Sequence, residues 1–289
     1  MIESPLKIIE CPRDAMQGLV DFIPTKIKAA YINQLLKVGF DTVDFGSFVS
    51  PKAIPQMRDT ADVLHQLDLN SASSKLLAII ANERGAQDAA SFSEIDYLGY
   101  PFSVSETFQM RNTNATLEES LGRLEAISSI AENNHKQLVV YLSMGFGNPY
   151  GDKWNPDVVI HWSERLNNLF GIKILALSDT IGVADEATIT HLFEALTPAL
   201  PYVEFGAHLH ARSDDYEGKV AAAYSAGCRR FDGAIKGYGG CPMAKDDLTG
   251  NMPTEGMLNW FQSNGIVTNL DIEQFGKALA MSSTVFPIH

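Results

Sequence analysis

The sequence contains His208 and His210, two histidines separated by one residue, in an apolar run that predicts a β-strand. Residues two apart on a strand point to the same face, so both imidazoles can reach one cation. Imidazole nitrogens and a carboxylate such as Asp14 form a mixed ligand set that suits Mn, Mg, Fe or Zn. Taken alone, the pair is explained more simply by two structural histidines at a sheet end. Asp44 and Asn251, expected on neighbouring loops with Asp14, favour the cation.

Arg13 stands directly before Asp14 and has two explanations. Adjacent opposite charges usually form a solvated ion pair, whereas a guanidinium at a reaction centre stabilises negative charge that develops on a substrate oxygen. The position of Arg13 after the first predicted strand favours the second explanation. Cys241 either packs as a small apolar residue or lies on a glycine-rich lid, residues 237–251, that brings a thiol over the substrate. Both residues are therefore candidates for catalysis.

Eight short β-rich runs alternate with amphipathic helical stretches, which predicts an α/β fold of the (β/α)8 TIM-barrel type. We expect a single domain over residues 1–289, with extra C-terminal helices from about residue 255 that cap the barrel. A doubly wound open sheet has the same alternation, but no GxGxxG follows the first run and no GxxxxGK[ST] occurs anywhere. The runs are residues 6–10, 42–47, 75–80, 94–100, 137–144, 173–180, 203–210 and 229–235.

The candidate residues fall where these predicted strands end. In a barrel, catalytic groups lie where the strands enter the βα-loops. Several runs have polar residues in that place, and their agreement indicates one site rather than scattered surface charges. The residues are Arg13 and Asp14 after the first run, Asp44 near the end of the second, Asp179 after the sixth, His208 and His210 in the seventh, and Cys241 and Asn251 after the eighth.

Composition limits the class of protein and its partners. The chain has 289 residues, of which 45% are hydrophobic, and a formal net charge of -13. This charge argues against a nucleic-acid partner, because phosphate binding needs a Lys/Arg-rich face. No apolar stretch reaches the ~18–20 residues of a membrane span, and the N-terminus has no signal-peptide pattern. The three cysteines form no CxxC pair, so we expect a reducing cytoplasm.

Seven segments spread over nearly the whole chain resemble the 3-hydroxy-3-methylglutaryl-CoA (HMG-CoA) lyase branch of the metallolyase barrels. That group also includes the isopropylmalate and homocitrate synthases. SFVSP and the GGCP–GN loop are specific to the lyase branch, whereas the Arg-Asp and His-x-His elements are shared more widely. The segments are PRDAMQ (12–17), SFVSPKAIPQMRDT (47–60), SETFQMRNTNATLEES (105–120), GNPYGDKWNP (147–156), SDTIGVA (178–184), HLH (208–210) and GYGGCPMAKDDLTGN (237–251).

The resemblance implies a retro-Claisen cleavage of an acyl-CoA substrate to acetyl-CoA and acetoacetate, with Mg or Mn as cofactor, in a homodimer. Arg13 would polarise the thioester carbonyl, His208 would take the proton of the 3-hydroxyl, and Cys241 would protonate the enolate carbon. The implied cation ligands are Asp14, His208, His210 and Asn251. The predicted catalytic residues are Arg13, His208, Cys241, Asp44 and Asp179.

The chain departs from the family pattern near this centre. Ala15 stands where the family has the glycine of RDGLQ, and Asp44 stands where it usually has Glu. Ser178 replaces the glycine of GDTIG, and Ala211 follows the histidine pair where Asp-Thr is common. Two other functions stay open. An acetyl-CoA-condensing synthase is disfavoured by the short chain and the GGCP loop, and a non-catalytic metal-binding barrel is supported by the altered residues after His210.

Overall fold

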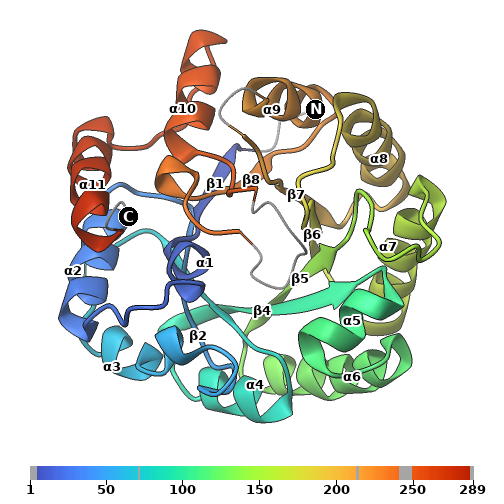
Figure 1. Cartoon of the computed structure of the whole chain (residues 1–289), viewed down its shortest axis with the longest axis horizontal. Helices are drawn as coiled ribbons and strands as arrows, with labels where there is room; N and C mark the ends of the chain where they lie inside the picture. Colours follow the sequence, from blue (N-terminus) through green and yellow to red (C-terminus); the bar gives the residue numbers. More distant parts are fainter. Residues whose placement is uncertain (1–4, 71, 213–214, 241–248, 287–289) are drawn as a thin grey trace.

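A computed structural model describes residues 5–70, 72–212, 215–240 and 249–286. Eight parallel strands pair in chain order and close into a barrel, in which β1 pairs with both β2 and β8 (Figure 1). Each strand overlaps one of the predicted runs, so the predicted TIM barrel is confirmed. The strands are β1 (Lys7–Glu10), β2 (Thr42–Ser47), β3 (Lys75–Ile79), β4 (Ile95–Ser103), β5 (Gln137–Ser143), β6 (Ile174–Ser178), β7 (Glu204–His208) and β8 (Arg230–Gly233).

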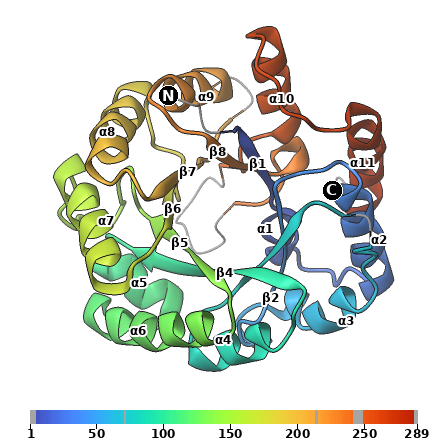
Figure 2. The same ribbon diagram turned by 180° about the vertical axis from the view of Figure 1, so that it is seen from behind.

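Helices surround the barrel, as the view from behind also shows (Figure 2). The C-terminal helices α10 and α11 pack against α9 and α2, and so complete the outer ring. Within the described ranges, no helix is long and apolar enough to cross a membrane. The outer helices are α2 (Thr25–Leu36), α3 (Thr60–Leu64), α4 (Glu83–Ala90), α5 (Glu106–Thr113), α6 (Leu117–Asn133), α7 (Pro156–Phe170), α8 (Glu186–Ala199), α9 (Tyr216–Ser225), α10 (Thr254–Ser263) and α11 (Ile272–Val285).

Side-chain caps define where several of these helices begin. The Thr116 hydroxyl accepts a hydrogen bond from the backbone N–H of Glu119, and the Glu119 carboxylate accepts one from the backbone N–H of Thr116. This capping box satisfies two backbone donors that the first turn leaves free. Asn155 and Asp185 cap α7 and α8 with their side chains in the same position. The polar residues before these helices therefore fix where each preceding loop ends.

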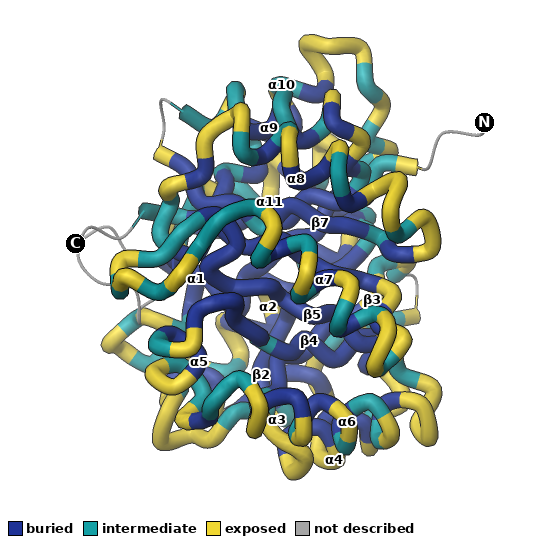
Figure 3. Tube along the Cα trace, turned by 90° about the vertical axis from the view of Figure 1, so that its right-hand side faces the viewer, coloured by how far each residue is buried: buried dark blue, intermediate teal, exposed yellow. Residues whose placement is uncertain are grey.

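The barrel interior is apolar on the side of β3 to β6. Buried residues are concentrated in the central strands, and the outer helices and loops carry the exposed residues (Figure 3). Gly99 creates space in this interior, since a Cβ there would lie 2.5 Å from Cδ1 of Ile79 and 3.2 Å from Cε2 of Tyr141. The interior apolar cluster consists of Leu77, Ile79, Tyr97, Val139, Tyr141, Ile174 and Ala176.

One short helix lies inside the outer ring. Helix α1 (Pro12–Gln17) follows β1 directly and lies at the barrel mouth (Figure 1). It begins at Pro12, whose fixed φ suits the first helical position. Arg13 and Asp14 follow in the same turn and are buried. The helix therefore holds this charged pair against the ends of the strands.

Candidate metal centre and active site

Three of the predicted ligands converge at the barrel mouth. Ligand atoms of Asp14, His208 and His210 all lie within 4.8 Å of one another, and the two imidazole centroids are 5.7 Å apart. Asp14 comes from α1, His208 ends β7, and His210 follows two residues later. A carboxylate and two imidazoles match the donor types that divalent first-row metals take. The described residues therefore offer a three-donor site for one divalent cation.

Asn251 joins this group through the loop after β8. Its amide nitrogen donates to Oδ2 of Asp14 at 2.7 Å and to the carbonyl oxygen of Tyr238 at 2.8 Å. An antiparallel bridge between His210 and Asn251 brings the segment to this position. The structure thus places all four predicted ligands together, with the Asn251 side chain in contact with the carboxylate of Asp14.

Arg13 is held in a buried cluster of ion pairs. Its Nε lies 3.0 Å from Oδ2 of Asp44, a terminal nitrogen also contacts Asp44, and the other donates to Oδ1 of Asp14 at 2.9 Å. Gln17 accepts from the same nitrogen at 3.0 Å. Three residues therefore fix the guanidinium, which lines the cavity at the barrel mouth.

The two carboxylates in this cluster respond differently to burial. Burial raises the pKa of Asp44 to about 6, although the charge and hydrogen bonds of Arg13 lower it. Burial also raises the pKa of Asp14, but the charges of Arg13, His208 and His210 and the hydrogen bond of Asn251 together lower it below its ordinary value. Asp14 is therefore ionised at neutral pH, as a ligand must be. Asp44 is absent from the residues that line the cavity and contacts Arg13 from behind.

The two histidines have opposite pKa shifts. Burial and the neighbouring His208 lower the pKa of His210 to about 4, so this imidazole is neutral at pH 7. Burial lowers the pKa of His208 as well, but the hydrogen bond and charge of Asp232 raise it above its ordinary value. The neutral His210 can thus bind a cation directly, whereas at His208 a proton competes with the cation for the ring nitrogen.

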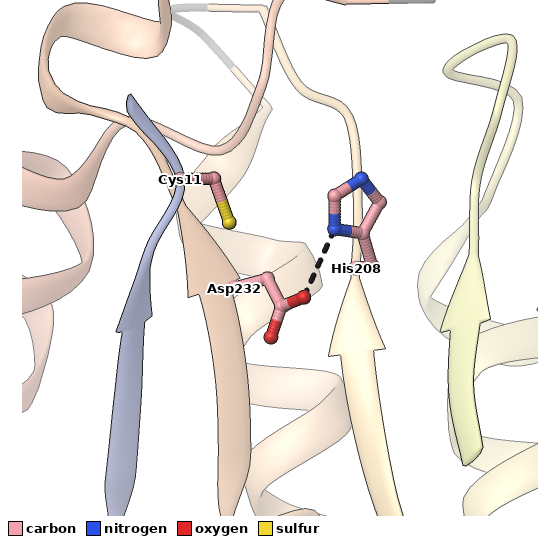
Figure 4. A group of neighbouring side chains, drawn as sticks. All are labelled: Cys11, His208 and Asp232. Carbon is pink, nitrogen blue, oxygen red and sulfur yellow. Dashed lines mark hydrogen bonds and ion pairs between the residues drawn. The ribbon is translucent and has the colours of Figure 1, made fainter. Parts of the chain in front are cut away.

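A second group lies behind His208. Asp232 Oδ2 is 3.1 Å from Nδ1 of His208, and the opposite ring nitrogen points away from Asp232 (Figure 4). Cys11 completes a triplet of ligand atoms within 4.8 Å of one another. Burial raises the pKa of the Cys11 thiol far above its ordinary value. His208 belongs to both groups, so we describe this triplet as the rear of the first site rather than as a second one.

A cavity of about 320 Å³ opens beside these residues. Its lining includes the charged or titratable residues Arg13, Asp14, His208 and His210. Its volume falls at the lower end of the range typical of small-molecule sites. Its apolar lining residues include Val49, Ala53, Ile54, Ile79, Pro101, Phe108 and Tyr141.

Asp179 lies next to the cavity without lining it. Its carboxylate accepts hydrogen bonds from the backbone amides of Val183 at 2.8 Å and Ala184 at 3.1 Å. The neighbouring residues Ser178 and Thr180 do line the cavity. Asp179 therefore shapes the loop after β6, and its backbone N–H donates to the carbonyl oxygen of His208 at 3.0 Å. The remaining predicted residue, Cys241, lies outside the described residues.

Three contacts of the site were not predicted from the sequence. Gln17 donates to Oδ1 of Asp14 at 2.7 Å, and Lys219 donates to the carbonyl oxygen of His210 at 2.7 Å. The third is the contact between Asp232 and Nδ1 of His208. A signal existed for Lys219, because it lies three, four and seven residues before alanines on the apolar face of its predicted helix. Asp232 had a weaker signal, a carboxylate two residues after Arg230 within a predicted strand.

Comparisons with known proteins agree with this geometry. Residues 6–281 match the family described as HMGL-like. A hydroxymethylglutaryl-CoA lyase of Bacillus subtilis is 34% identical, over 91% of this chain and 87% of the relative. A cytoplasmic HMG-CoA lyase of Rattus norvegicus is 32% identical, over 94% and 79%. The structure of an Acinetobacter baumannii HMG-CoA lyase in complex with coenzyme A and 3-methylmalate superposes with a TM-score of 0.89 at 29% identity, covering 97% of this chain and 91% of that one.

Proposed function

The chain belongs to the HMGL-like family, and from this premise we propose that it is a divalent-cation-dependent carbon–carbon lyase. The proposed reaction is the cleavage of HMG-CoA, or of a close 3-hydroxyacyl-CoA, to acetyl-CoA and acetoacetate. The observation that carries the proposal is the convergence of Asp14, His208 and His210 beside Arg13 in one cavity. Relatives named as HMG-CoA lyases and the coenzyme A bound by one of them support the thioester as substrate.

Asp14, His208, His210 and Asn251 are the proposed ligands of Mg or Mn. Two oxygen and two nitrogen donors suit these ions, with the amide oxygen of Asn251 as the fourth. When bound, the cation would act as a Lewis acid and lower the pKa of the substrate's 3-hydroxyl. The lowered pKa of Asp14 and the neutral imidazole of His210 support this ligand set.

Arg13 is the proposed partner of the thioester carbonyl. Breaking the C2–C3 bond leaves negative charge on that oxygen as the enolate forms, and a fixed guanidinium stabilises it. Asp44 and Gln17 hold the side chain in place before substrate arrives, so little reorganisation is needed. In this proposal Asp44 acts through Arg13, and Asp179 acts through the loop that it orders.

His208 is proposed both as a ligand and as the base that takes the 3-hydroxyl proton. Its Nδ1 faces Asp232, so a single nitrogen is left for the cavity. That nitrogen cannot hold a cation and a proton together. We assign it the ligand role in the resting enzyme and the acceptor role during cleavage. Cys241 is the proposed acid that protonates the enolate carbon, and Gly239, two residues earlier, packs against Asp14.

The decisive experiment assays the purified protein with Mg or Mn against a panel of 3-hydroxyacyl-CoA thioesters. We expect cation-dependent release of acetyl-CoA, with acetoacetate from HMG-CoA. Condensation of acetyl-CoA with a 2-oxo acid would indicate the synthase, and cation binding without any turnover would indicate a non-catalytic barrel. A cytoplasmic location and a homodimer are also proposed; light scattering after size exclusion tests the latter.

A further inference from the structure

Two charged residues of β8 lie inside the barrel. Arg230 and Asp232 are two apart on the strand, so they share its inner face, and they are 0% and 2% exposed. Gly206 on the neighbouring β7 leaves the space that Arg230 needs, since a Cβ there would lie 3.1 Å from Cδ of Arg230. The interior therefore has a polar side formed by β7 and β8, opposite the apolar cluster of β3 to β6.

The polar atoms on this side are incompletely paired. Among the described residues, Nε and one terminal nitrogen of Arg230, Oδ1 of Asp232 and the hydroxyl of Tyr141 have no hydrogen-bond partner. The other terminal nitrogen of Arg230 pairs with Glu204 at 3.1 Å, at the amino end of the barrel. A buried polar atom without a partner destabilises the fold, so such groups persist where they serve a network or a site. Arg230 places a positive charge in the region that holds the Asp232 carboxylate.

The upper end of this polar side contacts His208. Oδ2 of Asp232 is 3.1 Å from Nδ1 of His208, and the ring of Tyr141 meets the imidazole edge-on at 5.3 Å between centroids. Metal-binding histidines usually donate their second N–H to a carboxylate, which fixes the tautomer and the direction of the ligating lone pair. We propose that Asp232 is a positioning residue that keeps the proton of His208 on Nδ1 and aims Nε2 at the cation, with Arg230 as its buried counter-charge.

This inference rests on the cation site proposed above, but it can be tested without turnover. In the metal-free wild-type protein with 15N-labelled histidine, well above neutral pH, we expect the His208 proton on Nδ1. A His208→Gln spectrum assigns the resonance. Added Mg should then shift the Nε2 signal selectively. A proton on Nε2 would overturn the proposal, as would an Nε2 signal that is unaffected while His210 responds.

Replacing Asp232 separates positioning from mere stability. We expect Asp232→Asn to raise the dissociation constant for Mn by about 10–100-fold. The matched control is Asp59→Asn, a buried carboxylate that pairs with Lys28 at 2.6 Å on the outer side of the barrel. The Asp59→Asn control should lower the melting temperature but leave the affinity for Mn unchanged. Asp232→Glu, which keeps the carboxylate, should recover part of the Mn affinity that Asp232→Asn loses.

The outcomes distinguish this proposal from the proposed function. If Asp232→Asn is folded and binds Mn as the wild type does, or if both Asn variants lose affinity in proportion to lost stability, Asp232 has no positioning role. If it fails to fold, the tautomer of the wild-type His208 decides. A third outcome separates the two proposals. If the His208 proton is on Nδ1 and Asp232→Asn binds Mn more weakly, but the wild type cleaves no thioester, Asp232 keeps its positioning role and the proposed lyase activity is wrong.

Discussion

The amide nitrogen of Asn251 donates to Oδ2 of Asp14 at 2.7 Å, although 237 positions separate the two residues. Two backbone hydrogen bonds support this contact, because Ala211 donates to Gly250 at 3.0 Å and Met252 donates to Leu209 at 3.2 Å. The loops after β7 and β8 are therefore joined to each other and to α1. The ligand group depends on barrel closure as much as on the ligands themselves.

Asn251→Ala should weaken cation binding by about 10–100-fold, because it removes a proposed ligand and a hydrogen bond to Asp14. Mn titration followed by electron paramagnetic resonance measures the change. At saturating Mn, turnover should return close to the wild-type value. Asn264→Ala is a control, since Asn264 is exposed and its side-chain amide donates to the carbonyl of Trp260 at 2.8 Å, within its own helical turn. Wild-type affinity in Asn251→Ala would remove Asn251 from the ligand set.

His210→Ala should lose the cation and the activity together. The imidazole of His210 is buried and its pKa is about 4, so it offers a neutral nitrogen at any pH near 7. Metal content after gel filtration and lyase rate are the two measurements. His191→Ala, on the exposed face of α8, should change neither. Full metal occupancy in the His210 variant would contradict the assignment of His210 as a cation ligand.

Arg13→Met should lower turnover by at least ~100-fold while the cation stays bound, as expected for lost stabilisation of an oxyanion. It should also destabilise the fold by about 3–5 kcal/mol, because Asp44 is left buried without its partner. Activity assays measure turnover, and urea unfolding measures the free energy of unfolding.

The double variant Arg13→Met with Asp44→Asn separates these effects. Removing the unpaired carboxylate should restore most of the stability, and turnover should stay low because the guanidinium is still absent. Recovery of both quantities would mean that Arg13 is only a structural partner of Asp44.

His208→Gln should differ from Asn251→Ala in its response to cation. Both should bind Mn more weakly, but a residue that also accepts a proton leaves a deficit in turnover that saturating Mn does not repair. General-base catalysis contributes about 100–10,000-fold, so a residual loss of at least ~100-fold is expected. Complete recovery at saturating Mn would restrict His208 to the ligand role.

The sequence predicted the parts of this site that depend on local pattern. The strand alternation predicted His208 and His210 on one face, and Arg13 and Asp14 were predicted at the end of the first strand, although helix α1 itself was not. Two side-chain contacts that depend on how neighbouring strands pair were not predicted. Asp232 reaches His208 because β8 pairs with β7, and Asp44 contacts Arg13 because β2 pairs with β1. Side-chain direction at a strand end depends on those neighbours, which no local pattern specifies.

Cation binding should release at most about one proton per ion, and the number should rise as pH falls toward the raised pKa of His208. Asp232 raises the pKa of His208, so below that pKa a proton competes with the cation and apparent affinity falls as pH falls. Above that pKa the affinity should level off. His210, with a pKa of about 4, is already neutral and adds no slope above about pH 5. Calorimetric Mg titrations in two buffers of different ionisation enthalpy count the protons. Two protons released at neutral pH would show that His210 is charged in the free site, contrary to its buried environment.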